Sequence, residues 1–87
     1  MDFEYGRAKS MVNLKKHGID FIGAQALWSD ADRIEIPARS LDEPRIQVIG
    51  RIGELVWSAF VTVRDDRIRI ISVRRARDEE KAAYLQD

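Results

Sequence analysis

Six of the eleven arginines in this chain stand between Arg64 and Arg77, in the run R-D-D-R-I-R-I-I-S-V-R-R-A-R. The whole chain has 15 basic and 15 acidic residues, so the positive charge is a local feature of this segment. A guanidinium is planar and permanently charged, and its donors match the oxygens of a phosphate. The arginines alternate with Ile68, Ile70 and Val73, which indicates a strand that would hold them in fixed positions. The segment therefore predicts a site for a phosphate backbone.

Composition limits the other kinds of site that the 87 residues can build. The chain has no cysteine and one histidine, so neither a disulfide, a thiolate metal site nor a multi-histidine metal site is expected. Hydrophobic residues make up 45% of the sequence, enough for one core, and no apolar run approaches the length of a membrane span. We expect a single cytoplasmic domain over residues 1–87, with no metal, no cofactor and no membrane contact.

The first half of the chain is predicted to be mostly helical. A short extended piece at residues 3–5 precedes a helix over residues 7–17, which ends at Gly18 because glycine adopts the left-handed conformation easily. A second helix follows Asp20, which can cap its first turn. A strand is expected at residues 32–36, ending at Pro37. The apolar residues at helical spacing in the two helices are Ala8, Met11, Val12, Phe21, Ala24, Leu27 and Trp28.

From Arg45 onward the apolar period changes to two. Residues 45–51, 55–64 and 67–75 are predicted to be antiparallel strands, joined by tight turns at residues 53–54 and 65–66. Residues 78–85 are predicted to form a final helix. The expected fold is α+β, with a short N-terminal strand, two helices, a four-stranded antiparallel sheet and a C-terminal helix. All helices are expected on one face of the sheet.

Two-residue turns would fix which residues face each other across the strands. Arg64 would then face Arg67, Thr62 would face Arg69, and Phe60 would face Ile71. The same parity places Arg74 on the apolar face, where an ion pair with Glu80 or with the final helix is expected. The apolar face would carry Ile46, Val48, Leu55, Trp57, Ala59, Val61, Val63, Ile68 and Ile70. The polar face would carry Arg45, Gln47, Arg51, Ser58, Thr62, Arg64, Arg67 and Arg69, with Phe60 and Ile71 among them.

Charged residues on the open face of an antiparallel sheet are also a common means of solvation. The sign of the charge favours a binding site, because few carboxylates share the predicted face with the arginines. Like charges at this density repel each other unless an anion joins them. Aromatic and hydroxyl groups beside them suit RNA, whose bases stack and whose 2′-OH both donates and accepts hydrogen bonds.

Four motifs follow one another along the chain: N-L-K-K-H-G at residues 13–18 with Phe21, I-G at 49–50, R-I-R-I-I-S-V-R-R-A at 67–76, and Glu80 with Tyr84. In this order and spacing they resemble the BrnT toxin family. The resemblance implies a RelE-like fold and an RNA-cleaving toxin of a type II toxin–antitoxin pair. It also implies a BrnA antitoxin of ribbon-helix-helix type as the partner, through which the complex binds operator DNA and represses its own operon.

The resemblance extends to individual positions. Lys16 and His17 fall on the K-H-G motif, and Arg45 falls on the arginine that opens the first long strand, after an acidic residue that is here Glu43. Arg64 ends the next strand, and the R-I-I-S-x-R motif carries Arg69, Ser72 and Arg74. The chain departs from the family at Gly6-Arg7, where Asp-Pro is usual, at Arg77, where Thr is usual, and in its short turn at residues 53–54.

The implied reaction is metal-free attack of the 2′-OH on phosphorus. Arg64, Arg69 and Arg45 would stabilise the phosphoryl charge, and Lys16, His17 and Glu43 are the candidates for proton transfer. Lys16 and His17 also suit a helix C-terminus without catalysis, and Tyr84 suits packing. Arg67, Arg51 and Thr62 join Arg45 as candidate RNA contacts. Arg74 and Tyr84 are further candidates for a catalytic role, with a structural ion pair and packing as the respective alternatives. The expected function is a ribonuclease toxin that inhibits translation; the alternative is a non-catalytic corepressor that binds the antitoxin.

Overall fold

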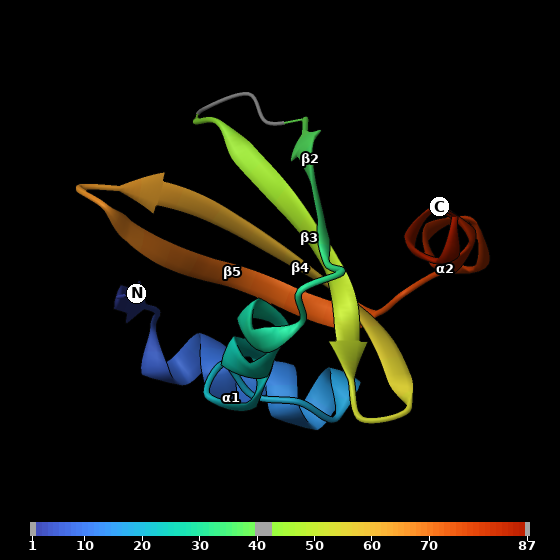
Figure 1. Cartoon of the computed structure of the whole chain (residues 1–87). Coiled ribbons are helices and arrows are strands. Elements are labelled where there is room, and N and C mark those ends of the chain that lie inside the picture. The colour runs from blue at the N-terminus through green and yellow to red at the C-terminus, as the bar shows by residue number, and fades with distance from the viewer. Residues whose placement is uncertain (1, 40–42, 87) are drawn as a thin grey trace.

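Five strands form one twisted sheet, and the helices pack on both of its faces (Figure 1). The computed structural model describes residues 2–39 and 43–86. Across the sheet the strands run in the order β1-β5-β4-β3-β2. The elements are β1 (Asp2–Glu4), α1 (Arg7–His17), the 3₁₀ helix η1 (Gly23–Ser29), β2 (Ile34–Ala38), β3 (Arg45–Ile52), β4 (Leu55–Arg64), β5 (Arg67–Arg75) and α2 (Asp78–Leu85).

The predicted α+β class is confirmed, but the four-stranded antiparallel sheet is wrong in detail. β1 joins the sheet as a fifth strand parallel to β5, with Phe3 opposite Ile68, so the sheet is mixed. A strand of three residues is too short for its apolar pattern to reveal a partner far along the chain. β2 also continues through Pro37, because an edge strand tolerates a residue without an N–H.

Both tight turns have the predicted length, and they set the register of the long strands. Gly53 has a φ of +60°, while Asp65 and Asp66 have φ values of +50° and +64°. Positive φ at both central residues is the type I′ geometry that suits strand twist, and Asp tolerates it better than most residues. The predicted pairs Arg64–Arg67 and Thr62–Arg69 are therefore confirmed.

A β-bulge in β5 changes the register beyond these pairs. Val61 pairs with Ile70, but Phe60 pairs with Ser72, so Ile71 is the additional residue. The predicted Phe60–Ile71 pair is therefore wrong. The bulge reverses the parity of the following residues, so Arg74 lies opposite Ser58 on the polar face rather than on the apolar face. The run of isoleucines gives no sequence signal for this interruption.

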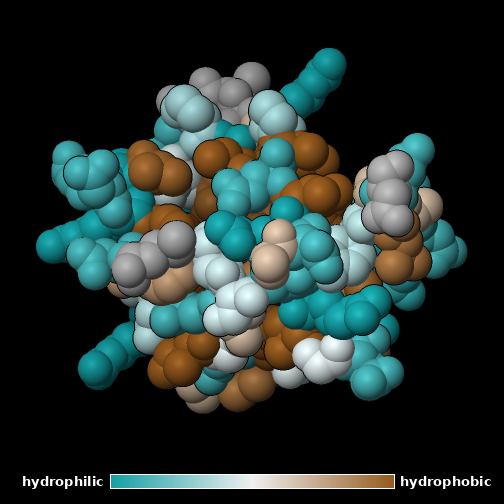
Figure 2. Space-filling view, viewed as in Figure 1, coloured by the Kyte–Doolittle hydropathy of each residue, from teal (hydrophilic) through white to brown (hydrophobic). Residues whose placement is uncertain are grey.

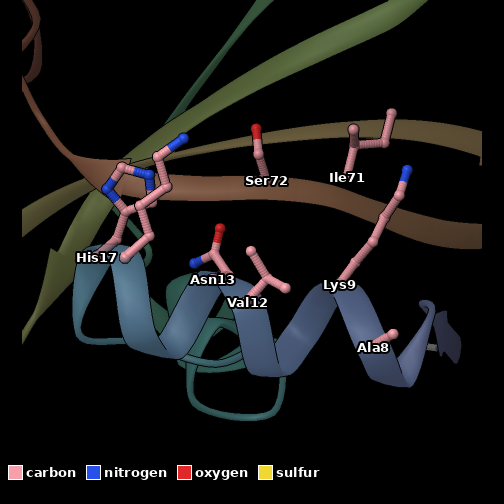
Figure 3. Close-up of a pocket in the computed structure, with 8 residues that line it drawn as sticks. Ala8, Lys9, Val12, Asn13, His17, Ile71 and Ser72 are labelled. Atoms are coloured by element: carbon pink, nitrogen blue, oxygen red, sulfur yellow. The ribbon is translucent and has the colours of Figure 1, made fainter.

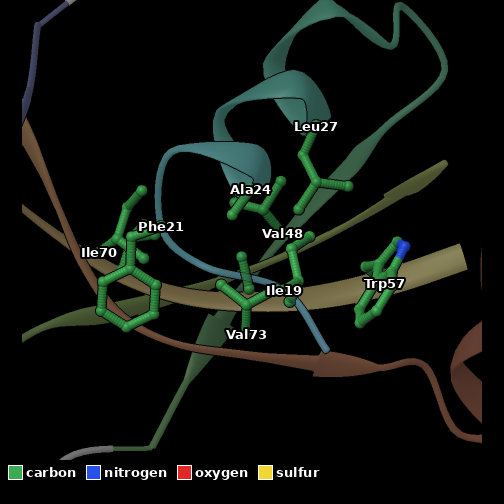
Figure 4. Close-up of a cluster of buried hydrophobic side chains, with 10 residues drawn as sticks. Ile19, Phe21, Ala24, Leu27, Val48, Trp57, Ile70 and Val73 are labelled. Atoms are coloured by element: carbon green, nitrogen blue, oxygen red, sulfur yellow. The ribbon is translucent and has the colours of Figure 1, made fainter. Parts of the chain in front are cut away.

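The main core lies between one face of the sheet and the segment from Ile19 to η1 (Figure 4). Phe21 and Leu27 are fully buried there, against Val48 and Ile70 of the sheet. Asp20 accepts a hydrogen bond from the N–H of Gly23 at 2.7 Å, which fixes the start of this segment as its sequence predicts. The remaining buried members are Ile19, Ala24, Trp57, Ala59, Val61 and Val73.

Polar side chains attach α1 to the sheet. The buried residues of α1 are Ser10 and Asn13, whereas Met11 and Val12 are 54% and 60% exposed, so the apolar residues at helical spacing in this helix do not form its buried face. On the side seen in Figure 2, hydrophobic residues reach the surface among hydrophilic ones.

The Asn13 amide donates to the carbonyls of Ile19 at 2.8 Å and Val73 at 2.9 Å, and its oxygen accepts from the Val73 N–H at 3.2 Å.

The Asn13 carboxamide thus pairs with the edge of β5 as a neighbouring strand would. β1 covers that edge only at residues 67–69, so the polar groups of Val73 need another partner. We expect Asn13→Leu to lower the free energy of unfolding by about 2–4 kcal/mol, because it leaves buried backbone groups unpaired. Urea unfolding measures this loss. The exposed control Met11→Ala should change stability by less than about 0.5 kcal/mol, and equal losses in the two variants would contradict the role of Asn13.

α2 packs on the polar face, so the expectation that all helices share one face is wrong for this element. The contact forms because Ile49 and Val56 are buried on that otherwise polar face, together with Ala76 and the partly buried Tyr84. In addition, the Tyr84 hydroxyl donates to Asp30 at 2.6 Å, which ties α2 to the end of η1. α2 therefore covers one end of the polar face and leaves the other end open.

Candidate functional site

The open end of the polar face carries the arginine cluster, which we define as Arg45, Arg64, Arg67 and Arg69. Arg69 lies opposite Thr62, and Arg64 lies opposite Arg67 at the β4–β5 turn. The Thr62 hydroxyl donates to the carbonyl of Pro44 at 2.8 Å, which fixes the start of β3 and hence Arg45. Three adjacent strands therefore bring the cluster together. Thr62 is 2% exposed, so in this arrangement it positions Arg45 and offers little surface of its own.

Negative charge only partly balances the arginine cluster. Glu4 of β1 lies 3.9 Å from Arg67 and 3.8 Å from Arg69, distances at which partly exposed ion pairs contribute little. Sequence reasoning missed Glu4, because only the parallel pairing of β1 places it there. Glu43 is half-buried just before β3. The Nε of Arg45 is buried and has no hydrogen-bond partner among residues 2–39 and 43–86, so one donor of the cluster is unused there.

Next to the cluster, Glu80 of α2 joins several polar groups of the sheet. Its carboxylate accepts two hydrogen bonds from Arg74, both at 2.8 Å, so the predicted ion pair is confirmed. Gln47 and Ser58 donate to the same carboxylate at 2.7 and 3.0 Å. The bonds from Arg74, then those from the Arg77 N–H, Gln47 and Ser58, outweigh desolvation and lower the pKa of Glu80 to about 2.

Arg74 is thereby held in a structural role. Its hydrogen bonds to Glu80 raise its pKa, so its charge is stable under all ordinary conditions. Its guanidinium also lies 5.2 Å from the ring centre of Phe60, which pairs with Ser72 on the polar face. Arg74 therefore borders the arginine cluster while its own donors are already engaged with α2.

Lys16 and His17 lie in a separate hollow, the α1–β5 groove (Figure 3). This groove has a volume of about 300 Å³, and Ser72 of β5 belongs to its lining. Lys16 and His17 therefore do not lie within the arginine cluster, but at the edge of the same strand that carries Arg69. The groove is lined by Ala8, Lys9, Val12, Asn13, Lys16, His17, Ile71 and Ser72.

Arg51 and Tyr84 form a third group at the opposite end of β4 from the arginine cluster. The Arg51 guanidinium lies 5.9 Å from the centre of the Tyr84 ring. The hydrogen bond to Asp30 raises the pKa of Tyr84. Burial raises the pKa of Asp30, but the bonds from Tyr84 and from the backbone N–H groups of Arg51 and Asp32 outweigh it, and the net pKa is lowered. These contacts fix α2, and the structure does not bring Arg51 or Tyr84 to the other candidate residues.

The chemistry available on the polar face is that of fixed cations. Within residues 2–39 and 43–86, no three His, Cys, Asp or Glu side chains are grouped so that they could hold a metal ion. No described helix is long and apolar enough to cross a membrane. Guanidinium groups fixed on a sheet can bind and stabilise an anionic phosphoryl group without reorganisation. Lys16 and His17 in the α1–β5 groove, and Glu43 just before β3, carry groups that can accept or donate protons beside the arginine cluster.

The sequence matches the model of a known protein family. The BrnT toxin family model, described as the ribonuclease toxin BrnT of type II toxin–antitoxin systems, matches residues 5–80. No curated protein matches the chain. The matched range contains α1, the arginine cluster and Glu80, whereas Tyr84 lies outside it.

Proposed function

The chain belongs to the BrnT family of type II ribonuclease toxins, and from this membership we propose that it cleaves RNA without a metal ion. A ribose 2′-OH would attack the adjacent phosphorus and expel the 5′-oxygen of the next nucleotide. The observation that carries this proposal is the convergence of Arg45, Arg64, Arg67 and Arg69 from three strands onto one open surface. The α+β layout is compatible with the RelE-like fold that the family resemblance implies.

Arg69 is the central residue of the proposed phosphate site. It is half-buried on β5 between its neighbours in the sheet, so its guanidinium is better fixed than those of the exposed Arg64 and Arg67. Arg45 approaches from β3, across Thr62, with a donor that no described residue uses. Donors that are fixed before the reaction stabilise developing charge strongly, because they need no reorganisation in the transition state.

The proton-transfer groups are proposed to act from the edges of this surface. His17 and Lys16 face the groove beside Ser72, and Glu43 precedes Arg45. His17 carries the imidazole of the set, a group that can act as a general base or as a general acid, which suits either accepting the 2′-OH proton or protonating the leaving oxygen. Glu43 and Lys16 are the other two candidates for these steps.

As a type II toxin, the protein has an antitoxin partner. We propose a BrnA-like protein of ribbon-helix-helix type, which covers the arginine cluster and supplies the contacts to operator DNA. Free of this partner in the cytoplasm, the toxin would cleave RNA and inhibit translation. Formal neutrality of the chain suits this arrangement, because attraction for a polyanion then depends on local groups of cations such as the arginine cluster.

Expression without an antitoxin separates the enzyme from a corepressor that only binds its partner. The enzyme should arrest growth and degrade RNA, whereas Arg64→Ala or Arg69→Ala should restore growth at an equal protein level. Intact RNA in cells that express the unmodified toxin would overturn the enzyme and favour the corepressor. Northern analysis of abundant messages, together with growth curves, measures both outcomes.

A further inference from the structure

The α1–β5 groove has an excess of positive charge. Three of the four lysines in the chain stand in α1, and the helix sequence R-A-K-S-M-V-N-L-K-K-H contains no acidic residue. Lys9, Lys16 and His17 line the groove, and none of them forms an ion pair within the part of the chain that the structure describes. The groove therefore offers cations that the fold itself does not use.

The groove also has an apolar surface next to these cations. Ala8, Val12 and Ile71 contribute apolar atoms to its lining, and Ser72 contributes a hydroxyl. Figure 3 shows Lys9 and His17 projecting from α1 toward β5 at the two ends of the groove, with Val12 between them. Cations around an apolar surface match a single-stranded nucleic acid, which presents phosphates and the flat faces of bases.

The groove and the arginine cluster lie along the same strand, β5. The bulge places Ser72 opposite Phe60, while Arg69 lies opposite Thr62. Phe60 and Thr62 are two residues apart on β4, so the two pairs are neighbours on the polar face. Ser72 is three residues from Arg69, a distance of about 10 Å along a strand. An extended strand of RNA with one phosphate at Arg69 can therefore reach the groove without crossing α2, which packs at the other end of the polar face.

We propose that the α1–β5 groove binds single-stranded RNA beside the scissile phosphate, with Lys9 as a contact to a neighbouring phosphate. This inference rests on the proposed function and adds to it a substrate of several nucleotides. Lys9 is exposed on the outer rim of the groove and has no part in the proposed reaction. It contributes to the binding of longer RNA and leaves the chemical step unchanged.

Lys9→Gln tests the groove, and Lys15→Gln is its matched control, because Lys15 is exposed on the same helix but does not line the groove. We expect Lys9→Gln to raise the KM for an RNA oligonucleotide about three- to fivefold without changing kcat. The dependence of binding on salt should weaken by about 0.7 in the log–log slope. A dinucleotide, which has no second phosphate to place at Lys9, should be cleaved equally by both variants and by the unmodified protein.

Three results would overturn the groove as an RNA site. The first is an equal KM for the oligonucleotide in Lys9→Gln and Lys15→Gln. The second is an effect of Lys9→Gln on the dinucleotide as large as its effect on the oligonucleotide. The third is that Lys9→Gln weakens only the inhibition by the antitoxin and leaves cleavage of both RNAs unchanged. Binding of an oligonucleotide that is 2′-deoxy throughout, followed by fluorescence anisotropy, separates this inference from the proposed function. If the unmodified protein cleaves no RNA, the proposed function fails, but the dependence of this binding on Lys9 still decides the groove.

Discussion

Arg69→Ala is expected to lower kcat/KM for RNA cleavage by about 10²- to 10³-fold. The reason is its place at the centre of the arginine cluster, opposite Thr62 and beside the start of β3. Its ion pair with Glu4 is 3.8 Å long and partly exposed, so the free energy of unfolding should hardly change. Initial rates on a defined RNA measure kcat/KM, and unfolding followed by circular dichroism measures the free energy of unfolding, for Arg69→Ala and for the unmodified protein.

Arg75→Ala is the matched control for this prediction. Arg75 lies on the same strand but opposite Trp57, with its guanidinium 5.6 Å from the Trp57 ring and away from the arginine cluster. Arg75→Ala removes the same charge as Arg69→Ala. If the position of the arginine determines its effect on cleavage, the cleavage rate of Arg75→Ala should stay within about twofold of that of the unmodified protein. Arg69→Lys should restore only part of the activity, because an ammonium cannot bind a phosphate in a bidentate manner. Equal losses in Arg69→Ala and Arg75→Ala would show that only overall charge matters.

Glu80→Gln is expected to lower the free energy of unfolding by about 3 kcal/mol near neutral pH. The carboxylate joins α2 to the sheet through Arg74, Gln47 and Ser58, and its loss leaves the Arg74 charge without its partner. A loss of this size lowers Tm by roughly 12–24 °C in a domain of this length. Glu79→Gln is the control, since Glu79 is exposed on the same helix.

The pH dependence of stability tests the same carboxylate. The pKa of Glu80 is lowered from 4.5 to about 2, so its contribution is complete above the unfolded pKa and is lost as the pH falls from about 4.5 toward 2. Urea unfolding at several pH values should therefore show the unmodified protein approaching Glu80→Gln in stability as the pH falls through this range. A constant difference between the two curves would contradict the role of the ionised carboxylate.

Local rules were sufficient to predict most of the elements. β4, β5 and α2 begin and end at the predicted residues, because strand alternation and the two tight turns are encoded within a few neighbouring positions. The turn at Asp65 and Asp66 then fixes the pairing of Arg64 with Arg67 and of Thr62 with Arg69. The arginine cluster was therefore predictable as far as these pairs extend.

The errors arose where distant parts of the chain decide the structure. The bulge at Ile71 depends on how β5 pairs with β4, and it moved Arg74 to the polar face. The burial of Asn13 depends on the uncovered edge of β5, which the sequence of α1 does not show. Ile49 and Val56 on the polar face are the one local signal for the position of α2, and single apolar residues on a polar face are weak signals.

The candidate site was predicted in part. Sequence reasoning grouped Lys16, His17 and the arginines as one set, whereas the structure places the first two in a groove beside β5. Arg51 was grouped with the cluster because its parity places it on the polar face. Parity does not show that α2 packs on the end of that face where Arg51 lies. The catalytic roles of Lys16, His17, Glu43, Arg64 and Arg69 remain predictions for the experiments above.

Metal-free cleavage is tested most directly by incubating RNA with purified, antitoxin-free protein in the presence of EDTA. We expect cleavage at defined positions, products that end in a 2′,3′-cyclic phosphate, and no cleavage where a single 2′-deoxynucleotide replaces the nucleotide 5′ of the scissile bond. The arginine cluster would supply the charge stabilisation, so Arg69→Ala should abolish most of this cleavage. Intact RNA under these conditions, or unchanged cleavage of the 2′-deoxy substrate, would rule out metal-free cleavage through the 2′-OH.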